Sequence, residues 1–124
     1  MSKTPLNINI VRKGEQKHVH RKLPRGKNPL SYAYRALSDH RLAGQFQAYL
    51  IEFQGGIKEE IPLVSHEGEE FIYLLEGEVE FRSPKESFTL KPGDSLHFDA
   101  SIPHGFVNQN RKIAKAIGIV SQKP

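Results

Sequence analysis

Three side chains with metal-binding chemistry fall at informative spacings in the second half of the sequence. His66 lies four residues before Glu70, and His104 follows in a segment marked by proline and glycine. Imidazole nitrogen together with carboxylate oxygen suits a divalent transition metal such as Fe, Mn, Ni or Zn. Two histidines and one carboxylate leave coordination positions open, so such a site can activate water or polarise a bound oxygen. We therefore predict a divalent-metal site at His66, Glu70 and His104.

The same three residues also fit a pocket without metal, in which they form hydrogen bonds beside a bound ligand. A carboxylate enclosed by apolar residues is costly to keep ionised, so burial alone raises the pKa of Glu70. A metal ion, an imidazolium or a cationic ligand beside Glu70 is therefore expected. The residues expected around the site, as core or as pocket lining, are Phe46, Val64, Ile72, Phe98 and Phe106.

Short β-strands must position these residues. Polar and apolar residues alternate at nearly even spacing, and turn residues such as Gly77, Pro84 and Gly93 separate the alternating stretches. This pattern predicts an all-β sandwich or barrel in residues 31–124. A further edge strand is an option at residues 6–11, and one helical turn at residues 30–42. The main expected strands are residues 32–37, 45–53, 70–75, 78–81, 87–90, 95–98, 105–108 and 112–120.

Residues 1–30 have the composition of an extended basic arm. Residues 1–43 contain ten Lys or Arg against two acidic residues, whereas residues 44–124 contain eight against twelve. We interpret the arm as solvated, with docking on a polyanion or an acidic partner through residues 12–27 as the alternative. Stacking aromatic residues are absent from this stretch, so we expect no nucleic-acid binding without a partner chain.

Several classes of protein are excluded by composition. The longest apolar run, residues 71–75, is far shorter than the roughly 18 residues of a membrane helix. No apolar signal-peptide segment precedes the first charges, so a cytoplasmic location and no membrane contact are expected. The chain has no cysteine, which excludes disulfides and thiol catalysis.

Residues 70–75 are apolar on both faces of the expected strand. One face lies toward the barrel interior, and the other must be covered by a second layer or another subunit. We predict a homodimer on this basis, with the N-terminal strands as the alternative cover. The inner face carries Glu70, Ile72 and Leu74, and the outer face carries Phe71, Tyr73 and Leu75.

Two motifs resemble those of the cupin superfamily. The stretch SHEGEEFIYLLEGEVEF resembles the first cupin motif, in which a His-x-His pair is followed by x3-Glu-x6-Gly, with matches at His66, Glu70 and Gly77. The resemblance covers about residues 44–120. It implies a double-stranded β-helix, or jelly-roll barrel, with the ligands inside. The second motif, PGDSLHFDASIPHGFVN, matches at Gly93, Asp94, Pro103, His104 and Asn108.

One departure from the family pattern bears on function. Val64 occupies the position of the first motif's leading histidine, which reduces the family's four ligands to three. His97 does not replace it, because Leu96 and Phe98 look core-facing and put His97 on the opposite face. The resemblance therefore implies a weaker metal set than the family norm.

The motifs are most similar to the cupin domains that follow a helix-turn-helix domain in bacterial transcription regulators. Only the arm precedes the barrel, so we expect a stand-alone sensor barrel that binds a small molecule. The alternative is a metal-dependent cupin enzyme of dioxygenase or isomerase type.

Overall fold

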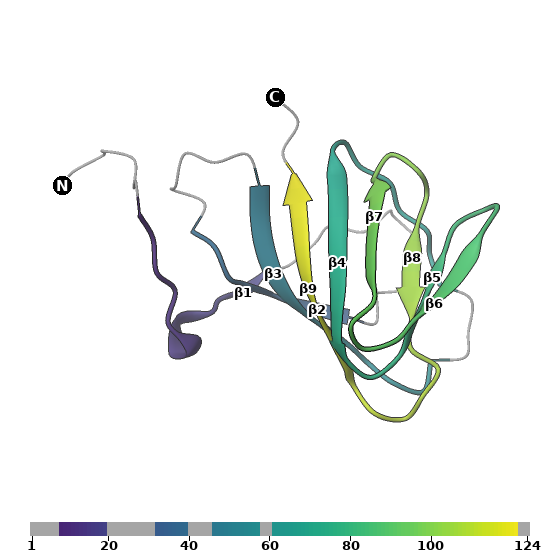
Figure 1. Cartoon of the computed structure of the whole chain (residues 1–124), viewed down its shortest axis with the longest axis horizontal. Coiled ribbons are helices and arrows are strands. Elements are labelled where there is room, and N and C mark those ends of the chain that lie inside the picture. The colour runs from purple at the N-terminus through teal and green to yellow at the C-terminus, as the bar shows by residue number, and fades with distance from the viewer. Residues whose placement is uncertain (1–7, 20–31, 40–45, 58–60, 122–124) are drawn as a thin grey trace.

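The computed structural model describes residues 8–19, 32–39, 46–57 and 61–121. These residues form two antiparallel sheets, one with the strand order β1-β2-β3-β9-β4-β7 and one with the order β6-β5-β8 (Figure 1). None of the described residues belongs to a helix long and apolar enough to cross a membrane. The elements are η1 (Lys13–Glu15), β1 (His18–Val19), β2 (Tyr32–Ala36), β3 (Phe46–Phe53), β4 (Glu69–Glu76), β5 (Val79–Arg82), β6 (Ser87–Leu90), β7 (Ser95–Asp99), β8 (Gly105–Val107) and β9 (Ala114–Ser121).

The main expected strands are all present, with ends within two residues of the predicted ones. The all-β jelly-roll prediction is therefore confirmed. Two local options, the edge strand at residues 6–11 and the helical turn at residues 30–42, fall only partly within the described residues. The described residues 8–11 form no strand, and β1 instead pairs with β2, His18 opposite Arg35. In the range 30–42 the described residues form β2 and a bend, whereas η1 lies in the arm.

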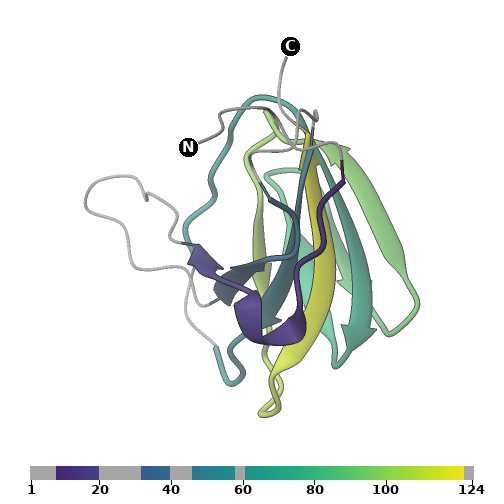
Figure 2. The same cartoon turned by 90° about the vertical axis from the view of Figure 1, so that its left-hand side faces the viewer.

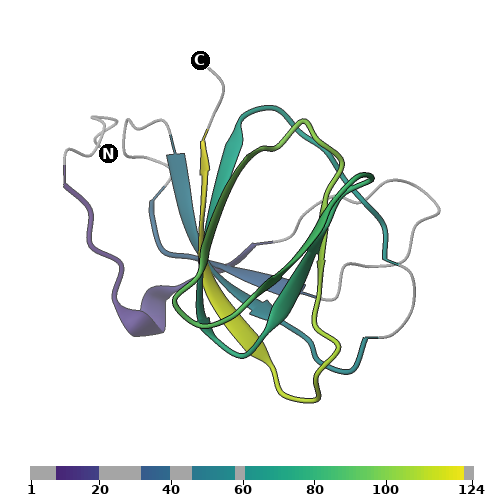
Figure 3. The same cartoon turned by 45° about the vertical axis from the view of Figure 1, so that its right-hand side comes forward.

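Alternation along the strands sends one set of side chains into the space between the two sheets. Ile72 and Leu74 of β4 are completely buried, and the ring of Phe106 packs against those of Phe53 and Phe81 with centroids 5.6 and 5.4 Å apart. Figure 2 and Figure 3 show the two sheets from other sides. The barrel core therefore combines aliphatic residues with an aromatic cluster, and it supports the strands that carry the site.

Gly118 of β9 explains how the larger sheet accommodates these bulky residues. It lies between Tyr49 of β3 and Ile72 of β4 in the ladder. A Cβ atom at Gly118 would lie 2.6 Å from Cδ1 of Ile51. The missing side chain thus leaves space that Ile51 fills in the core.

The outer face of β4 is not covered by the N-terminal strands. Phe71, Tyr73 and Leu75 are 36%, 40% and 43% exposed. The strands β1 and β2 lie beside β3 and extend the sheet, so they do not form a layer over β4. The prediction that the N-terminal strands cover the outer face of β4 is therefore wrong for the strands that the structure describes.

Candidate metal centre

The loop that carries His66 is fixed by hydrogen bonds to the loop after β7. The amide of His66 donates to the carbonyl of Ala100, and the amide of Ala100 donates to the carbonyl of Gly68, both at 2.9 Å. Gly68 has φ +100°, and a Cβ atom there would lie 2.4 Å from the carbonyl oxygen of Ser121. Only glycine lets the chain pass this close to β9 in this conformation. The turn places His66 beside the start of β4.

Glu70 is the second residue of β4, and its buried side chain points into the barrel. It pairs with Val120 of β9 on one side and with Phe98 of β7 on the other, so all three share the inner face of the sheet. The Glu70 side chain is 3% exposed. An ionisable group is therefore held in apolar surroundings, where it requires a partner of opposite charge or a hydrogen-bond donor.

His104 lies immediately before β8, on the strand segment that faces the loop of His66. Its backbone pairs with that of Val64, and the residue is 1% exposed. The ring of Phe98 lies edge-on to it at a centroid distance of 4.7 Å, and the ring of Phe81 lies nearly parallel to it at 6.5 Å. These aromatic contacts restrict the orientation of the imidazole.

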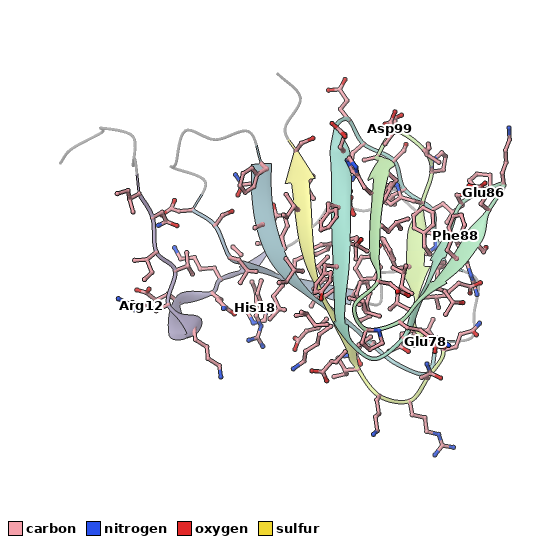
Figure 4. The ribbon with its side chains drawn as sticks, viewed as in Figure 1. Arg12, His18, Glu78, Glu86, Phe88 and Asp99 are labelled. Atoms are coloured by element: carbon pink, nitrogen blue, oxygen red, sulfur yellow. The ribbon has the colours of Figure 1, made fainter. Side chains whose placement is uncertain are left out.

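The three predicted ligands converge on one point. Nε2 of His66 lies 2.9 Å from Oε1 of Glu70, and Nε2 of His104 lies 3.6 Å from the same oxygen. One donor atom from each residue can be chosen so that all three lie within 4.8 Å of one another. The two loops meet at the end of the barrel where Asp99 lies, opposite the end that carries Glu78 (Figure 4).

The electrostatics of the site keep Glu70 ionised. Burial raises the pKa of Glu70, but hydrogen bonds from His104 and His66, together with their positive charge, outweigh it and lower the pKa to about 2. The sequence-based expectation that burial alone would raise the pKa, and that a cationic partner such as an imidazolium would lie beside Glu70, agrees with these opposing effects. Both His66 and His104 occupy this partner position in the structure.

The other nitrogen of each imidazole determines what faces Glu70. Nδ1 of His104 lies 2.7 Å from the carbonyl oxygen of Ile102, and Nδ1 of His66 lies 3.1 Å from that of Glu67. A carbonyl oxygen only accepts, so each Nδ1 carries the hydrogen and each Nε2 faces Glu70. In a neutral ring that Nε2 presents a lone pair to a carboxylate. Either protons on the rings or a shared metal ion must then balance the negative charge of Glu70. Metal-ligating histidines are often oriented in this way, by a hydrogen bond from Nδ1 to a backbone carbonyl.

The predicted pocket residues divide into two groups. Phe98 contacts His104, Phe106 packs behind Phe98 with centroids 6.3 Å apart, and Val64 pairs with His104. Ile72 is buried on the same face as Glu70. Phe46 is not brought to the site: it is 54% exposed and lies opposite Ser121, one residue out of step with the row of Glu70. Its assignment to the core was wrong, because a one-residue step along a strand reverses the face.

Other residues near the motifs lie as follows. His97 is on the outer face, as predicted, with Nε2 2.7 Å from Oε1 of Glu69. His18 is exposed on β1 (Figure 4), and His20 lies outside the described residues. Val120 flanks Glu70 and was not predicted, because the register of β4 against β9 cannot be read from the sequence.

The fold and the site together define a small jelly-roll barrel with two histidines and one glutamate facing inward at one end. A family model described as Cupin domain matches residues 49–120, which is more than half of the chain. The chain therefore belongs to the cupin family. No curated protein matches it in sequence.

Solved structures of several kinds share the fold. FeII HppE superposes with a TM-score of 0.74 at 21% identity, over 91% of this chain and 60% of that one. A sugar phosphate isomerase from a cupin superfamily, from Silicibacter pomeroyi, gives 0.69 at 20% identity, over 94% and 77%. The Cupin_2 domain of an XRE family transcriptional regulator from Enterobacter cloacae gives 0.61 at 22% identity, over 76% and 98%. At these identities the likeness shows the fold alone. The chain spans about 60% of the length of HppE.

Proposed function

We propose that this cupin binds a divalent transition metal and, at that metal, a small molecule, in a sensor or regulatory role. His66, Glu70 and His104 would hold the ion, with Nε2 of each histidine and a carboxylate oxygen as donors. Fe, Mn, Ni or Zn suits this donor set. When bound, the metal supplies a Lewis acid with open positions for an oxygen or nitrogen atom of the ligand.

The observation that carries the proposal is the orientation of the two imidazoles. Both Nδ1 atoms are committed to backbone carbonyls, and both Nε2 atoms face one ionised, buried carboxylate. A purely structural histidine needs only one such partner, whereas here two rings and a carboxylate are turned toward a common point. The phenylalanine side chains beside His104 would give the ligand an apolar wall.

Elemental analysis of freshly purified protein tests the metal. We expect close to one transition-metal ion per chain in the wild type and a large loss in His66→Ala and His104→Ala. His97→Ala is the matched control, because His97 is an exposed histidine on the other face of the sheet. A wild-type protein that stays metal-free after addition of Fe(II), Mn(II) and Ni(II) would refute the proposal.

A thermal-shift screen tests the small molecule. Amino acids, polyamines, sugars and organic acids are added to the metal-loaded and the chelator-treated protein. A ligand that binds at the ion raises the melting temperature of the loaded protein only. A flat response across the whole screen, in both forms, would contradict a ligand-binding role even if the metal is present.

A metal-dependent enzyme is the second candidate, and the three-residue ligand set favours it. Three protein donors leave more than one coordination position for a substrate and a second reactant. Oxygen consumption by the Fe(II)-loaded protein with a candidate substrate would support a dioxygenase. A ligand that raises the melting temperature yet is recovered unchanged, without oxygen uptake, would favour the sensor.

A further inference from the structure

Four inward-facing residues cross the larger sheet in one row at the end that carries the candidate metal centre. Glu70 of β4 pairs with Phe98 of β7 on one side and with Val120 of β9 on the other. Val120 pairs in turn with Gln47 of β3. Directly paired residues project to the same face, so all four side chains point into the barrel. We call them the inner row: Gln47, Val120, Glu70 and Phe98. Two strand spacings separate Gln47 from Glu70, which puts their Cα atoms about 10 Å apart.

The hydroxyl of Ser38 fixes the orientation of the Gln47 amide. Its oxygen accepts a hydrogen bond from the backbone amide of Ala48 at 2.9 Å, and the hydroxyl donates to Oε1 of Gln47 at 3.3 Å. Because the amide oxygen of Gln47 is used in this way, its NH2 group points away from Ser38. None of the described residues accepts a hydrogen bond from that NH2 group. Its donor hydrogens are therefore available to a molecule bound in the barrel.

Solvent reaches the inner row, although its side chains point inward. Gln47, Val120 and Phe98 are each only partly buried, and the His66 side chain beside them is 24% exposed. Further along β4, the inward-facing Ile72 is completely buried. The starts of β3 and β4 and the end of β9 lie at the same end of the sheet (Figure 1). A small molecule therefore has access to the inner row from this end of the barrel.

We propose that Gln47 is a specificity-determining residue for the small molecule bound at the candidate metal centre, and that Ser38 is its positioning residue. This inference rests on the proposed function. One end of the ligand faces the metal centre, and its middle lies over the apolar side chain of Val120. The NH2 group of Gln47 donates a hydrogen bond to an oxygen atom at the far end of the ligand.

The charges around the inner row define the chemical class of this ligand. A divalent ion held by Glu70 and two neutral imidazoles keeps a net positive charge, which favours a carboxylate at the near end of the ligand. The inner faces of β2, β3, β4, β7 and β9 carry no Lys or Arg among the described residues. A second anionic group would therefore lack a cation beside Gln47, whereas an amide NH2 group suits a neutral acceptor. The ligand class is a monoanionic acid with a carbonyl, amide or hydroxyl oxygen at its far end.

Calorimetric titration of the Ni(II)-loaded full chain tests the inference. The probes are the half-amides of malonic, succinic and glutaric acid, each compared with the alkanoate that has an isopropyl group in place of the amide group. At least one half-amide should bind the wild type about tenfold more tightly than its alkanoate. Gln47→Leu and Gln47→Glu should abolish this preference, because neither side chain has an NH2 group, while Gln47→Glu still accepts from Ser38. Ser38→Ala should reduce the preference without abolishing it.

The metal content of each variant, measured first, separates this inference from the proposed function. A wild type that takes up no metal overturns both. A loaded wild type without preference for any half-amide, or a preference that survives in Gln47→Leu and Gln47→Glu, overturns this inference alone. Gln109→Leu is the matched control, because Gln109 is exposed after β8 and its loss should leave the preference unchanged. An unchanged preference in Ser38→Ala would overturn the positioning role of Ser38.

Discussion

Val64 and His104 form a two-way backbone pair, in which the amide of each donates to the carbonyl of the other at 2.9 Å. Residues paired in this way project to the same side of the backbone. The side chain of Val64 therefore lies on the same side as the imidazole of His104. The position where the family motif has its first histidine is thus occupied here by an apolar side chain next to the candidate metal centre.

Val64→His should strengthen metal binding. A histidine at this position adds a third imidazole next to His104 and restores the four-ligand set implied by the family motif. We expect the dissociation constant for Ni(II) or Fe(II) to fall by about tenfold or more, which corresponds to about 1.4 kcal/mol. Competition with a chromophoric chelator measures it. Val64→Leu is the control of similar volume without a donor atom, and equal affinities in the two variants would contradict this geometry.

The stability of the metal-free protein should depend on pH through Glu70. Its pKa falls from 4.5 in the unfolded chain to about 2 in the folded one. The ionised carboxylate therefore contributes stability that is fully present above about pH 4.5 and is lost as the pH falls toward 2. We compare urea unfolding of chelator-treated wild type with that of Glu70→Gln, which cannot titrate. The difference in unfolding free energy should shrink across this window. A difference that stays constant with pH would show that Glu70 is not the titrating group.

The spacing of apolar residues and turn residues was sufficient to predict the strands and the fold class. Strands such as β4 and β9 bury one face more deeply than the other, and that difference leaves a period of two in the sequence. The grouping of His66, Glu70 and His104 was also predictable, because these residues match the cupin motifs, and the structure brings their donor atoms together. The opposite orientation of His97 followed from Leu96 and Phe98 on either side of it.

Other features depend on register, which residue patterns do not specify. Phe46 was placed in the core, yet it begins β3 one residue out of step with the inner row. The lowered pKa of Glu70 depends on two imidazoles that come from loops 38 residues apart in the chain. The contact between Glu70 and Val120 requires the pairing of β4 with β9. Such long-range pairings are set by tertiary packing and not by local preference.

Gly68→Ala should weaken both the fold and the metal site. The substitution places a Cβ atom 2.4 Å from the carbonyl oxygen of Ser121 at a φ of +100°. Gly93→Ala is a close control, because Gly93 has φ +92° and nothing within 4 Å of a Cβ atom. The control should lose only about 1–2 kcal/mol for the backbone conformation. Gly68→Ala should lose more and should also bind metal more weakly, because it displaces the loop of His66. Urea unfolding and metal titration give the two readouts, and equal losses in both variants would contradict the close approach.

Asn108→Ala should destabilise the protein without removing the metal. The buried Asn108 amide donates to the carbonyls of Phe53 at 3.2 Å and Lys112 at 2.7 Å, and its side-chain oxygen accepts from the amide of Asn110 at 3.0 Å. Asn108, which matches a position of the second cupin motif, thus links the end of β3 to the loop before β9. Its side chain makes these links through hydrogen bonds to backbone groups. Loss of these bonds leaves buried backbone groups unpaired, at a cost of about 2–3 kcal/mol. Gln109→Ala, exposed on the same loop, should change little. An Asn108→Ala protein that is as stable as wild type but empty of metal would instead place Asn108 in the site.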